Sequence, residues 1–170
     1  MNNIYLVGFM ATGKSVVGKA LAKKLQSIFI DLDELIEKKA GKNIPSIFRV
    51  KGEAYFRKIE KEALRQVSGR NNLVVSCGGG VVTNAQNIKV MKKSGRIICL
   101  KASPVVILKR STKDSNRPLL NVDSPKNRIK ELLLKRAVFY SKADYTLDTS
   151  RIGVGQVVDK LVQYIQNFND

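Results

Sequence analysis

The sequence predicts an α/β fold in which a parallel sheet is covered by helices on both faces. Short apolar, β-branched runs alternate with helical patterns along the 170 residues. Strands that are apolar on both faces and joined by helices need helices on both sides of the sheet. One long polar stretch, residues 111–124, interrupts the alternation, and such loops in compact domains are usually functional or disordered. A chain of this length fits one domain, residues 1–170.

The strands are predicted from apolar, β-branched runs, and the helices from apolar residues that recur every three or four positions. The C-terminal segment shows the helical pattern most clearly. The helical pattern that begins near residue 32 stops near Gly41, a residue type that commonly ends helices. In chain order we expect strand 4–7, helix 15–25, strand 28–30, helix 32–39, helix 52–67, strand 73–77, helix 85–92, strand 97–100, helix 104–110, helix 125–142, strand 145–147 and helix 154–168.

Composition excludes several classes of function. Because the chain has no histidine, it has neither a Ser-His-Asp triad nor a His-ligated zinc site, and any proton acceptor must be a carboxylate, a thiolate or a lysine. Cys77 and Cys99 end apolar runs and lack metal-ligand spacing, so buried thiols are favoured over a redox or metal role. No apolar run is long enough to span a membrane, and the first residues lack the positive region of a secretory signal. A cytoplasmic location is expected.

The chain is strongly basic, with 31 Lys and Arg against 14 Asp and Glu and a net charge of +17. Clustered cations bind nucleic-acid phosphates, but here basic residues are spread over nearly every helical segment, and aromatic residues make up only 6%. A surface that binds single strands places aromatic side chains beside its cations. A solvated cationic surface that also attracts anionic substrates is therefore favoured over a nucleic-acid partner.

Residues 8–15, Gly-Phe-Met-Ala-Thr-Gly-Lys-Ser, match the phosphate-binding loop pattern G-x-x-x-x-G-K-[ST]. The match lies directly after an apolar strand and before a helix, where backbone N–H groups can surround phosphates. Lys14 is expected on the β- and γ-phosphate oxygens and Ser15 on Mg²⁺. The pattern predicts a nucleoside triphosphate site. Kinases, GTPases and motor ATPases share such a loop, so other residues must indicate the acceptor.

The candidate acceptor residues each have a functional and a structural interpretation. Asp31 and Asp33 follow the second strand two residues apart, so both carboxylates can face the ligand crevice of the sheet. One could hold Mg²⁺ through water and the other accept a hydroxyl proton. Alternatively, both are acidic residues at a helix N-terminus that interact favourably with the helix dipole. Three further features could also contact a ligand. Alternatively, Arg57 with Glu60 is an ordinary ion pair, Gly78–Gly80 is a flexible turn, and Arg136 is a solvated arginine.

Taken together and in order, these segments resemble shikimate kinase over essentially the whole chain. The resemblance implies a three-layer α/β/α P-loop fold of the nucleoside-monophosphate-kinase type, with a five-stranded parallel sheet in the order 2-3-1-4-5. It also implies a substrate-binding region over about residues 32–62 and a lid over about residues 111–124. The matching residues are Gly8–Ser15, Asp31–Asp33, Gly52, Glu53, Phe56, Arg57, Glu60, Gly78–Gly80, Arg117–Leu120, Arg136, Tyr140, Ala143 and Asp144.

The function implied by the resemblance is ATP-dependent phosphorylation of the 3-hydroxyl of shikimate, in chorismate and aromatic amino acid biosynthesis, and a monomer is expected. Lys14, Asp33 and Arg117 would be catalytic. Shikimate would be bound by Asp33, Arg57, Gly78, Gly79, Gly80 and Arg136, with both of these arginines on its carboxylate. ATP would be bound by Gly8, Ala11, Thr12, Gly13, Lys14, Ser15, Val16, Arg110, Arg117 and Arg151, with Arg110 beside the adenine. Mg²⁺ is the implied cofactor, at Ser15 and, through water, Asp31.

Two positions depart from the family pattern, and two other functions stay open. Ala11 stands where the family usually has a third loop glycine, and it would be strained at a positive φ. Cys77 stands where a threonine is frequent. A gluconate or nucleotide kinase would share the phosphate loop and lid without needing Arg57 and Arg136. A nucleotide-gated nucleic-acid-binding protein would instead bind DNA with an affinity that falls steeply with salt.

Overall fold

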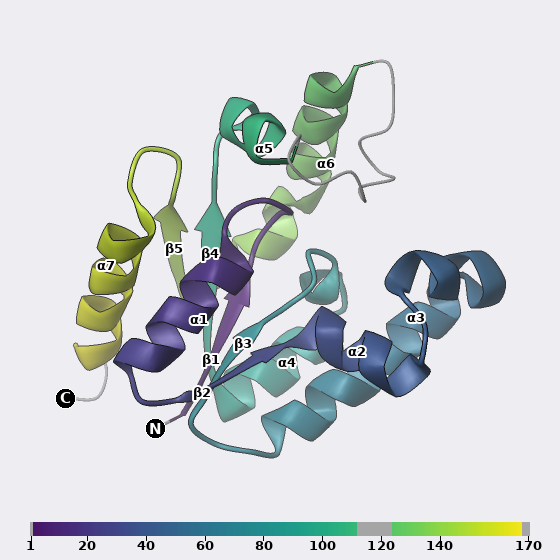
Figure 1. The fold of residues 1–170 in the computed structure, drawn as a ribbon, viewed down its shortest axis with the longest axis horizontal. Helices are drawn as coiled ribbons and strands as arrows, with labels where there is room; N and C mark the ends of the chain where they lie inside the picture. The colour runs from purple at the N-terminus through teal and green to yellow at the C-terminus, as the bar shows by residue number, and fades with distance from the viewer. Residues whose placement is uncertain (1, 112–123, 168–170) are drawn as a thin grey trace.

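A parallel sheet forms the centre of the computed structural model, which describes residues 2–111 and 124–167 (Figure 1). Within these residues five strands pair in the order β2-β3-β1-β4-β5, and every pairing is parallel. The order implied by the resemblance is therefore confirmed. The strands are β1 (Asn3–Val7), β2 (Ile28–Asp31), β3 (Leu73–Ser76), β4 (Gly95–Lys101) and β5 (Tyr145–Asp148).

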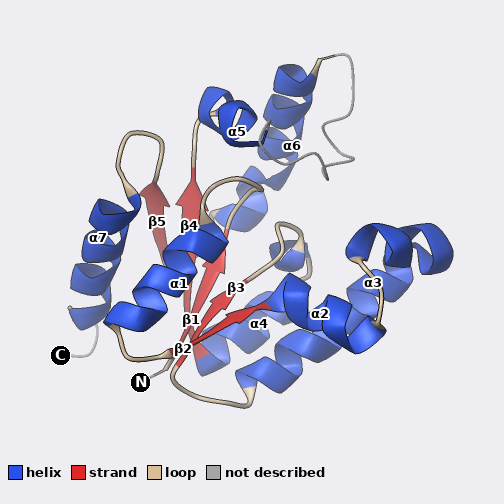
Figure 2. Cartoon of the chain, in the orientation of Figure 1, coloured by secondary structure: helices blue, strands red, loops and turns tan. Residues whose placement is uncertain are grey.

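Helices cover both faces of this sheet and extend beyond the carboxyl ends of its strands (Figures 1 and 2). One face carries α1 (Lys14–Lys24) and α7 (Val154–Gln166). The other carries α2 (Leu32–Ala40), α3 (Ile44–Ser68), the 3₁₀ turn η1 (Val81–Thr83) and α4 (Ala85–Ser94). Helices α5 (Pro104–Ser111) and α6 (Pro125–Tyr140) lie above the end of β4, with residues 112–123, including Arg117 and most of the expected lid, outside the described residues.

The central strand shows why the fold has three layers. In β1, Tyr5 and Val7 pack into the core beneath α3 and α4, whereas Ile4 and Leu6 pack into the core beneath α1 and α7. All four side chains are at most 2% exposed. Burying a large apolar side chain contributes roughly 1.5–3 kcal/mol, so these four consecutive apolar residues stabilise both layers at once.

A smaller apolar cluster connects the phosphate loop to the helices above it. Phe9 of the loop packs with Ala102, with Ile107 of α5, and with Ile129 and Leu132 of α6. These side chains are at most 8% exposed. The position of α6 is therefore fixed by contact with the loop that precedes α1, which matters because α6 carries Arg136.

The structure differs from the sequence prediction at the start of α3. A helix was expected from residue 52, but α3 begins at Ile44, after Asn43, whose side chain accepts a hydrogen bond from the N–H of Ser46 at 2.9 Å. Gly52 has φ 76° and ψ 172°, so two helical segments meet there at a kink. Glycine adopts a positive φ without the strain that a side chain would cause.

Two expectations about single features can also be compared with the structure. Cys77 and Cys99 are free thiols, 1% and 2% exposed, which confirms that both are buried. In the described ranges, 2–111 and 124–167, none of the helices has the length and apolar character required to cross a bilayer.

Candidate active site

The phosphate loop connects β1 to α1 and depends on glycine at its two ends. Gly8 has φ 136°, and a Cβ there would lie 2.1 Å from the carbonyl oxygen of Leu100. Gly13, which precedes α1, has φ 98°. Ala11 has φ 59°, although it carries a side chain. The loop therefore adopts the positive φ at residue 11 that the sequence identified as a source of strain.

Side chains from the loop itself and from two other segments hold the loop through its backbone. The hydroxyl of Thr12 donates to the carbonyl of Phe9 at 2.8 Å, and that of Thr149, after β5, donates to the carbonyl of Thr12 at 3.1 Å. Arg110, in the last turn of α5, donates to the carbonyls of Ala11 at 3.4 Å and Thr149 at 2.8 Å. Arg110 was expected beside the adenine, and its guanidinium lies where it connects the loop to the segment after β5.

The two residues expected to serve Mg²⁺ are in direct contact. The hydroxyl of Ser15 donates to Asp31 Oδ2 at 2.7 Å. The other oxygen, Asp31 Oδ1, accepts a hydrogen bond from the N–H of Asp33 at 3.1 Å and caps α2. Asp31 therefore has the structural role of capping a helix N-terminus, and its second oxygen contacts the hydroxyl of Ser15. Asp33 lies in the first turn of α2 and not on the strand, because Asp31 ends β2.

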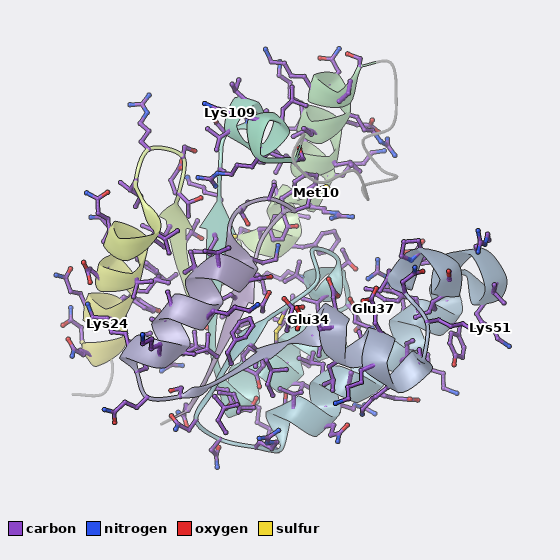
Figure 3. All side chains as sticks on the ribbon, viewed as in Figure 1. Met10, Lys24, Glu34, Glu37, Lys51 and Lys109 are labelled. Atoms are coloured by element: carbon purple, nitrogen blue, oxygen red, sulfur yellow. The ribbon has the colours of Figure 1, made fainter. Side chains whose placement is uncertain are left out.

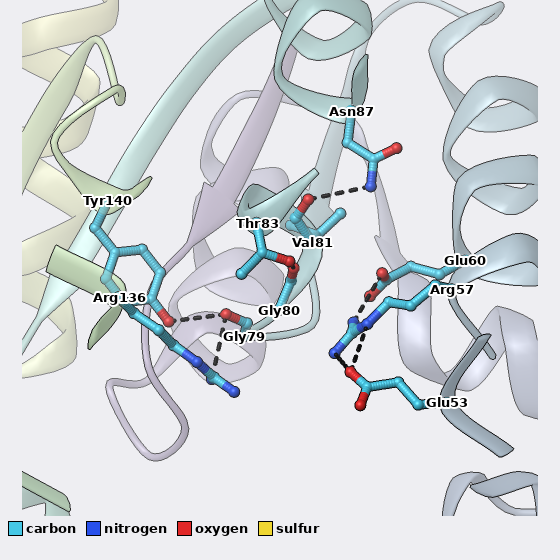
Figure 4. Close-up of polar contacts among 10 residues, drawn as sticks. All are labelled: Glu53, Arg57, Glu60, Gly79, Gly80, Val81, Thr83, Asn87, Arg136 and Tyr140. Atoms are coloured by element: carbon cyan, nitrogen blue, oxygen red, sulfur yellow. Dashed lines mark hydrogen bonds and ion pairs between the residues drawn. The ribbon is translucent and has the colours of Figure 1, made fainter. Parts of the chain in front are cut away.

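Arg136 and Tyr140 approach the triple-glycine turn from α6 (Figure 4). Tyr140 donates its hydroxyl to the carbonyl of Gly79 at 2.8 Å, and Arg136 Nη1 donates to the same oxygen at 3.4 Å. The guanidinium of Arg136 also lies over the ring of Phe9, 5.6 Å from its centre. Burial raises the pKa of Tyr140 to about 12, so its hydroxyl stays protonated and remains a donor at neutral pH.

Arg57 approaches the same turn from α3, on the opposite side from Arg136 (Figure 4). Its guanidinium donates to Glu60 Oε2 at 2.9 Å and to Glu53 Oε1 at 3.1 and 3.2 Å. A Cβ on Gly80 would lie 2.6 Å from both terminal nitrogens of Arg57. The turn therefore accommodates this arginine only because residue 80 has no side chain.

Asp33 lies beside the first glycine of the turn. A Cβ on Gly78 would be 2.7 Å from Asp33 Oδ1 and 3.4 Å from Glu60 Oε1. Burial raises the pKa of Asp33, the neighbouring carboxylates of Asp31 and Glu60 also raise it, and Lys14 lowers it, so that the pKa lies at about 6. An aspartate with this pKa exchanges a proton near neutral pH, which suits a group that orients or deprotonates a hydroxyl.

The residues expected to bind substrate therefore come together around Gly78–Gly80, from α2, α3 and α6. Others lie apart: Val16 is exposed in the first turn of α1, and Arg151 is exposed in the connection between β5 and α7. Basic side chains also project from many separate elements, as Lys24, Lys51 and Lys109 show (Figure 3). This distribution matches the spread of charge expected from the sequence.

Glu60 is buried, whereas the sequence indicated no more than a possible surface ion pair with Arg57. Glu60 is only 1% exposed, and among the described residues its Oε1 has no hydrogen-bond partner. Burial raises the pKa of Glu60, whereas Arg57 lowers it. Phe9 and Thr149 were missed as supports of Arg136 and the loop. The i, i+3 spacing of Arg57 and Glu60 was visible in the sequence, but the burial of Glu60 depends on the turn after β3.

Comparisons with known proteins agree with this arrangement. A family model described as Shikimate kinase matches residues 10–166. A shikimate kinase from Thermodesulfovibrio yellowstonii is 45% identical over all of this chain and 98% of its own length, and one from Caldanaerobacter subterraneus is 48% identical over 96% of this chain and 95% of its own.

Solved structures give the same result. Shikimate kinase from Acinetobacter baumannii, in complex with shikimate, matches with a TM-score of 0.93 and 38% identity, covering 98% of this chain and 94% of that one. The enzyme from Aquifex aeolicus matches with a TM-score of 0.82 and 37% identity over 98% of both chains. With the phosphate loop after β1 and two arginines at one glycine turn, this chain belongs to the shikimate kinase family.

Proposed function

We propose that Arg57 and Arg136 bind the carboxylate of shikimate on the turn formed by Gly78–Gly80, while the phosphate loop binds ATP. As a shikimate kinase, the enzyme phosphorylates shikimate with ATP; the 3-hydroxyl is the proposed acceptor. The observation that carries the assignment is that two arginines from different helices flank one turn whose glycines leave room for them. Two guanidinium groups fix the orientation of a carboxylate better than one.

Asp33 is proposed to hold the acceptor hydroxyl. Its carboxyl lies next to Gly78, and the charge of Lys14 acts on it, so it stands between the glycine turn and the phosphate loop. With its pKa at about 6, most molecules carry an ionised Asp33 at pH 7.5, able to accept a hydrogen bond or the hydroxyl proton. The proton released on phosphorylation would then leave through this carboxylate.

Lys14 is proposed to neutralise the charge of the transferring phosphoryl group. Phosphoryl transfer depends mainly on positioning and on electrostatic stabilisation, and a lysine at the end of the loop supplies both. In the free enzyme Lys14 Nζ donates to the carbonyl of Phe9 at 2.9 Å, which holds the ammonium at the loop. Arg117, outside the described residues, is proposed to add a second positive charge.

The oxygens of Ser15 and Asp31 fit Mg²⁺, which prefers hard oxygen ligands and keeps several waters. Ser15 would bind the ion through its hydroxyl, and Asp31 would bind one of its waters, since Asp31 already caps α2. When bound, Mg²⁺ supplies charge neutralisation at the β- and γ-phosphates.

Arg110 is proposed to flank the adenine while it holds the loop backbone. Arg151 and Val16 would lie along the nucleotide. The enzyme is also proposed to act as a cytoplasmic monomer without a nucleic-acid partner.

The function is tested by following ADP release with shikimate, gluconate and nucleoside monophosphates in turn. We expect turnover with shikimate to exceed turnover with every other acceptor by at least about 100-fold, because only shikimate presents its carboxylate to both arginines. A better rate with gluconate or a nucleotide would overturn the assignment. Salt-dependent binding of DNA at physiological ionic strength would contradict the absence of a nucleic-acid partner.

A further inference from the structure

A cavity of about 340 Å³ lies between α6 and the strands β4 and β5. It is distinct from the proposed shikimate site around Gly78–Gly80, since Asp33, Arg57 and Arg136 do not line it. Its floor is buried, whereas its outer wall on α6 and β5 is open to solvent. The lining residues are Phe9, Thr12, Cys99, Leu100, Lys101, Leu133, Ala137, Tyr140, Ser141 and Thr146. Ligand sites in proteins commonly have volumes of roughly 300–1,000 Å³.

The chemistry of the walls favours an aromatic ligand with one negative charge. The inner surface is mainly apolar and includes the rings of Phe9 and Tyr140. Lys101, at the exposed end of β4, is the one charged residue among the lining residues, and its charge also acts on Asp148 of the adjacent strand. The surrounding segments, residues 96–111 and 124–142, contain ten Lys and Arg against a single acid, Glu131. Such a local excess of positive charge attracts anions.

We propose that this cavity binds a small aromatic carboxylate, with its ring against Phe9 and Tyr140 and its carboxylate near Lys101. The cavity shares Phe9, Thr12 and Tyr140 with the active site, and two of these contact the groups proposed to bind shikimate. Phe9 lies beneath the guanidinium of Arg136, and Tyr140 donates to the carbonyl of Gly79. A ligand that presses on either ring shifts the contacts of Arg136 and Gly79. Occupancy is therefore coupled to shikimate binding; this coupling, unlike the binding itself, rests on the proposed function.

The test uses 2-naphthoate, with 2-naphthylmethanol as its neutral analogue. The chain has no tryptophan, so naphthalene fluorescence reports binding directly. We expect saturable binding of 2-naphthoate with a dissociation constant on the order of 1 mM or lower. Lys101→Gln should weaken 2-naphthoate roughly threefold to tenfold and leave 2-naphthylmethanol unchanged.

Two substitutions on α6 form a matched pair. Ala137→Phe puts a ring into the cavity from an exposed position and should weaken binding at least about tenfold, whereas Val138→Phe, 61% exposed and outside the lining, should not. Thr146→Tyr, from an exposed position on β5, is a second variant that fills the cavity if Ala137→Phe fails to fold.

Three results would overturn the site: no saturable binding to the unmodified enzyme, binding to both cavity-filling variants that is as tight as binding to the unmodified enzyme, or displacement of 2-naphthoate by an ATP analogue or by shikimate. Displacement would place the probe in the active site. The coupling is tested by the KM for shikimate. In the unmodified enzyme, saturating 2-naphthoate should change this KM at least about twofold, whereas in Ala137→Phe the same addition should leave it constant. An unchanged KM in the unmodified enzyme would overturn the coupling, and inactivity of the enzyme would contradict the proposed function without affecting the binding result.

Discussion

The glycine at position 80 allows the role of Arg57 to be tested by adding a single methyl group. Gly80 has φ −99° and ψ −7°, a conformation that alanine adopts readily, so Gly80→Ala leaves the backbone unstrained. The new Cβ would lie 2.6 Å from both terminal nitrogens of Arg57, where ordinary contacts begin at about 3.4 Å. The guanidinium must therefore move by roughly 0.8 Å, and it is free to do so because it ends a flexible side chain.

This displacement should weaken shikimate binding and leave ATP binding almost unchanged. A charge-assisted hydrogen bond contributes about 1.5–3 kcal/mol, and a misplacement of about 1 Å can cost up to about 100-fold. We therefore expect the KM for shikimate to rise about 10- to 100-fold and the KM for ATP to change less than about twofold. Moving Arg57 away from buried Glu60 should also lower the free energy of unfolding by about 1 kcal/mol, which urea denaturation measures.

Two controls separate the proposed cause from a general effect of the substitution. Gly69→Ala adds a methyl group that makes only ordinary contacts, the carbonyl oxygen of Gln66 lying 3.6 Å away, and should leave both KM values unchanged. In an Arg57→Ala background, Gly80→Ala should change the KM for shikimate less than about twofold, because the guanidinium that the new methyl group would displace is absent. An unchanged KM after Gly80→Ala alone, or a full penalty that persists in the Arg57→Ala background, would refute the reasoning.

Four further predictions concern other parts of the site. Lys14→Ala should fold normally and lower kcat by several orders of magnitude in the ADP-release assay, and near-normal turnover would contradict its assignment to the phosphates. Arg136→Lys keeps the charge but loses the planar fork, so the KM for shikimate should rise about tenfold while that for ATP stays constant. Because the pKa of Asp33 is raised to about 6, mainly by burial, and its ionised form is the one proposed to hold the acceptor hydroxyl, kcat/KM should fall about tenfold per pH unit below pH 6; a flat profile down to pH 5 would exclude this titration. Ala11→Gly should relieve about 1–2 kcal/mol of strain, partly offset by the entropy that glycine adds to the unfolded chain, and raise the Tm by roughly 2–4 °C; a lowered Tm would show that the strain is smaller than this entropic cost.

The sheet and the phosphate loop could be predicted because their signals are local. Each strand is a short apolar run, and the loop pattern occupies the eight residues 8–15, between a strand and a helix. The kink in α3 could not be predicted in the same way. The structure begins α3 at Ile44, after the Asn43 cap, and places the non-helical Gly52 inside the helix, whereas the sequence predicted that the helix starts at residue 52. A positive φ at one glycine does not alter the spacing of apolar residues from which helices are predicted.

The sequence named the residues that the structure brings together at the glycine turn, but it did not predict their geometry. Arg57 and Arg136 were recognised through the motifs around them, yet their meeting at one turn requires α3 and α6 to pack on opposite sides of the segment after β3. The buried state of Glu60 follows from the same packing. Contacts between residues 57 positions apart, such as Arg136 with Gly79, are set by the fold as a whole, and no single segment encodes them.

Ala11 shows how the fold tolerates a residue that its own loop disfavours. Its φ of 59° costs roughly 1–2 kcal/mol for a residue with a side chain, and an isolated loop would relax to avoid this. Here Arg110 donates to the carbonyl of Ala11, Thr149 holds the carbonyl of Thr12, and Phe9 is buried against α5 and α6. These contacts come from three other parts of the chain, and together they exceed the strain, since each neutral or charge-assisted hydrogen bond contributes about 0.5–3 kcal/mol. The geometry of the phosphate site is thus imposed on the loop from outside, so a family glycine can be replaced by alanine where the surrounding contacts hold the backbone.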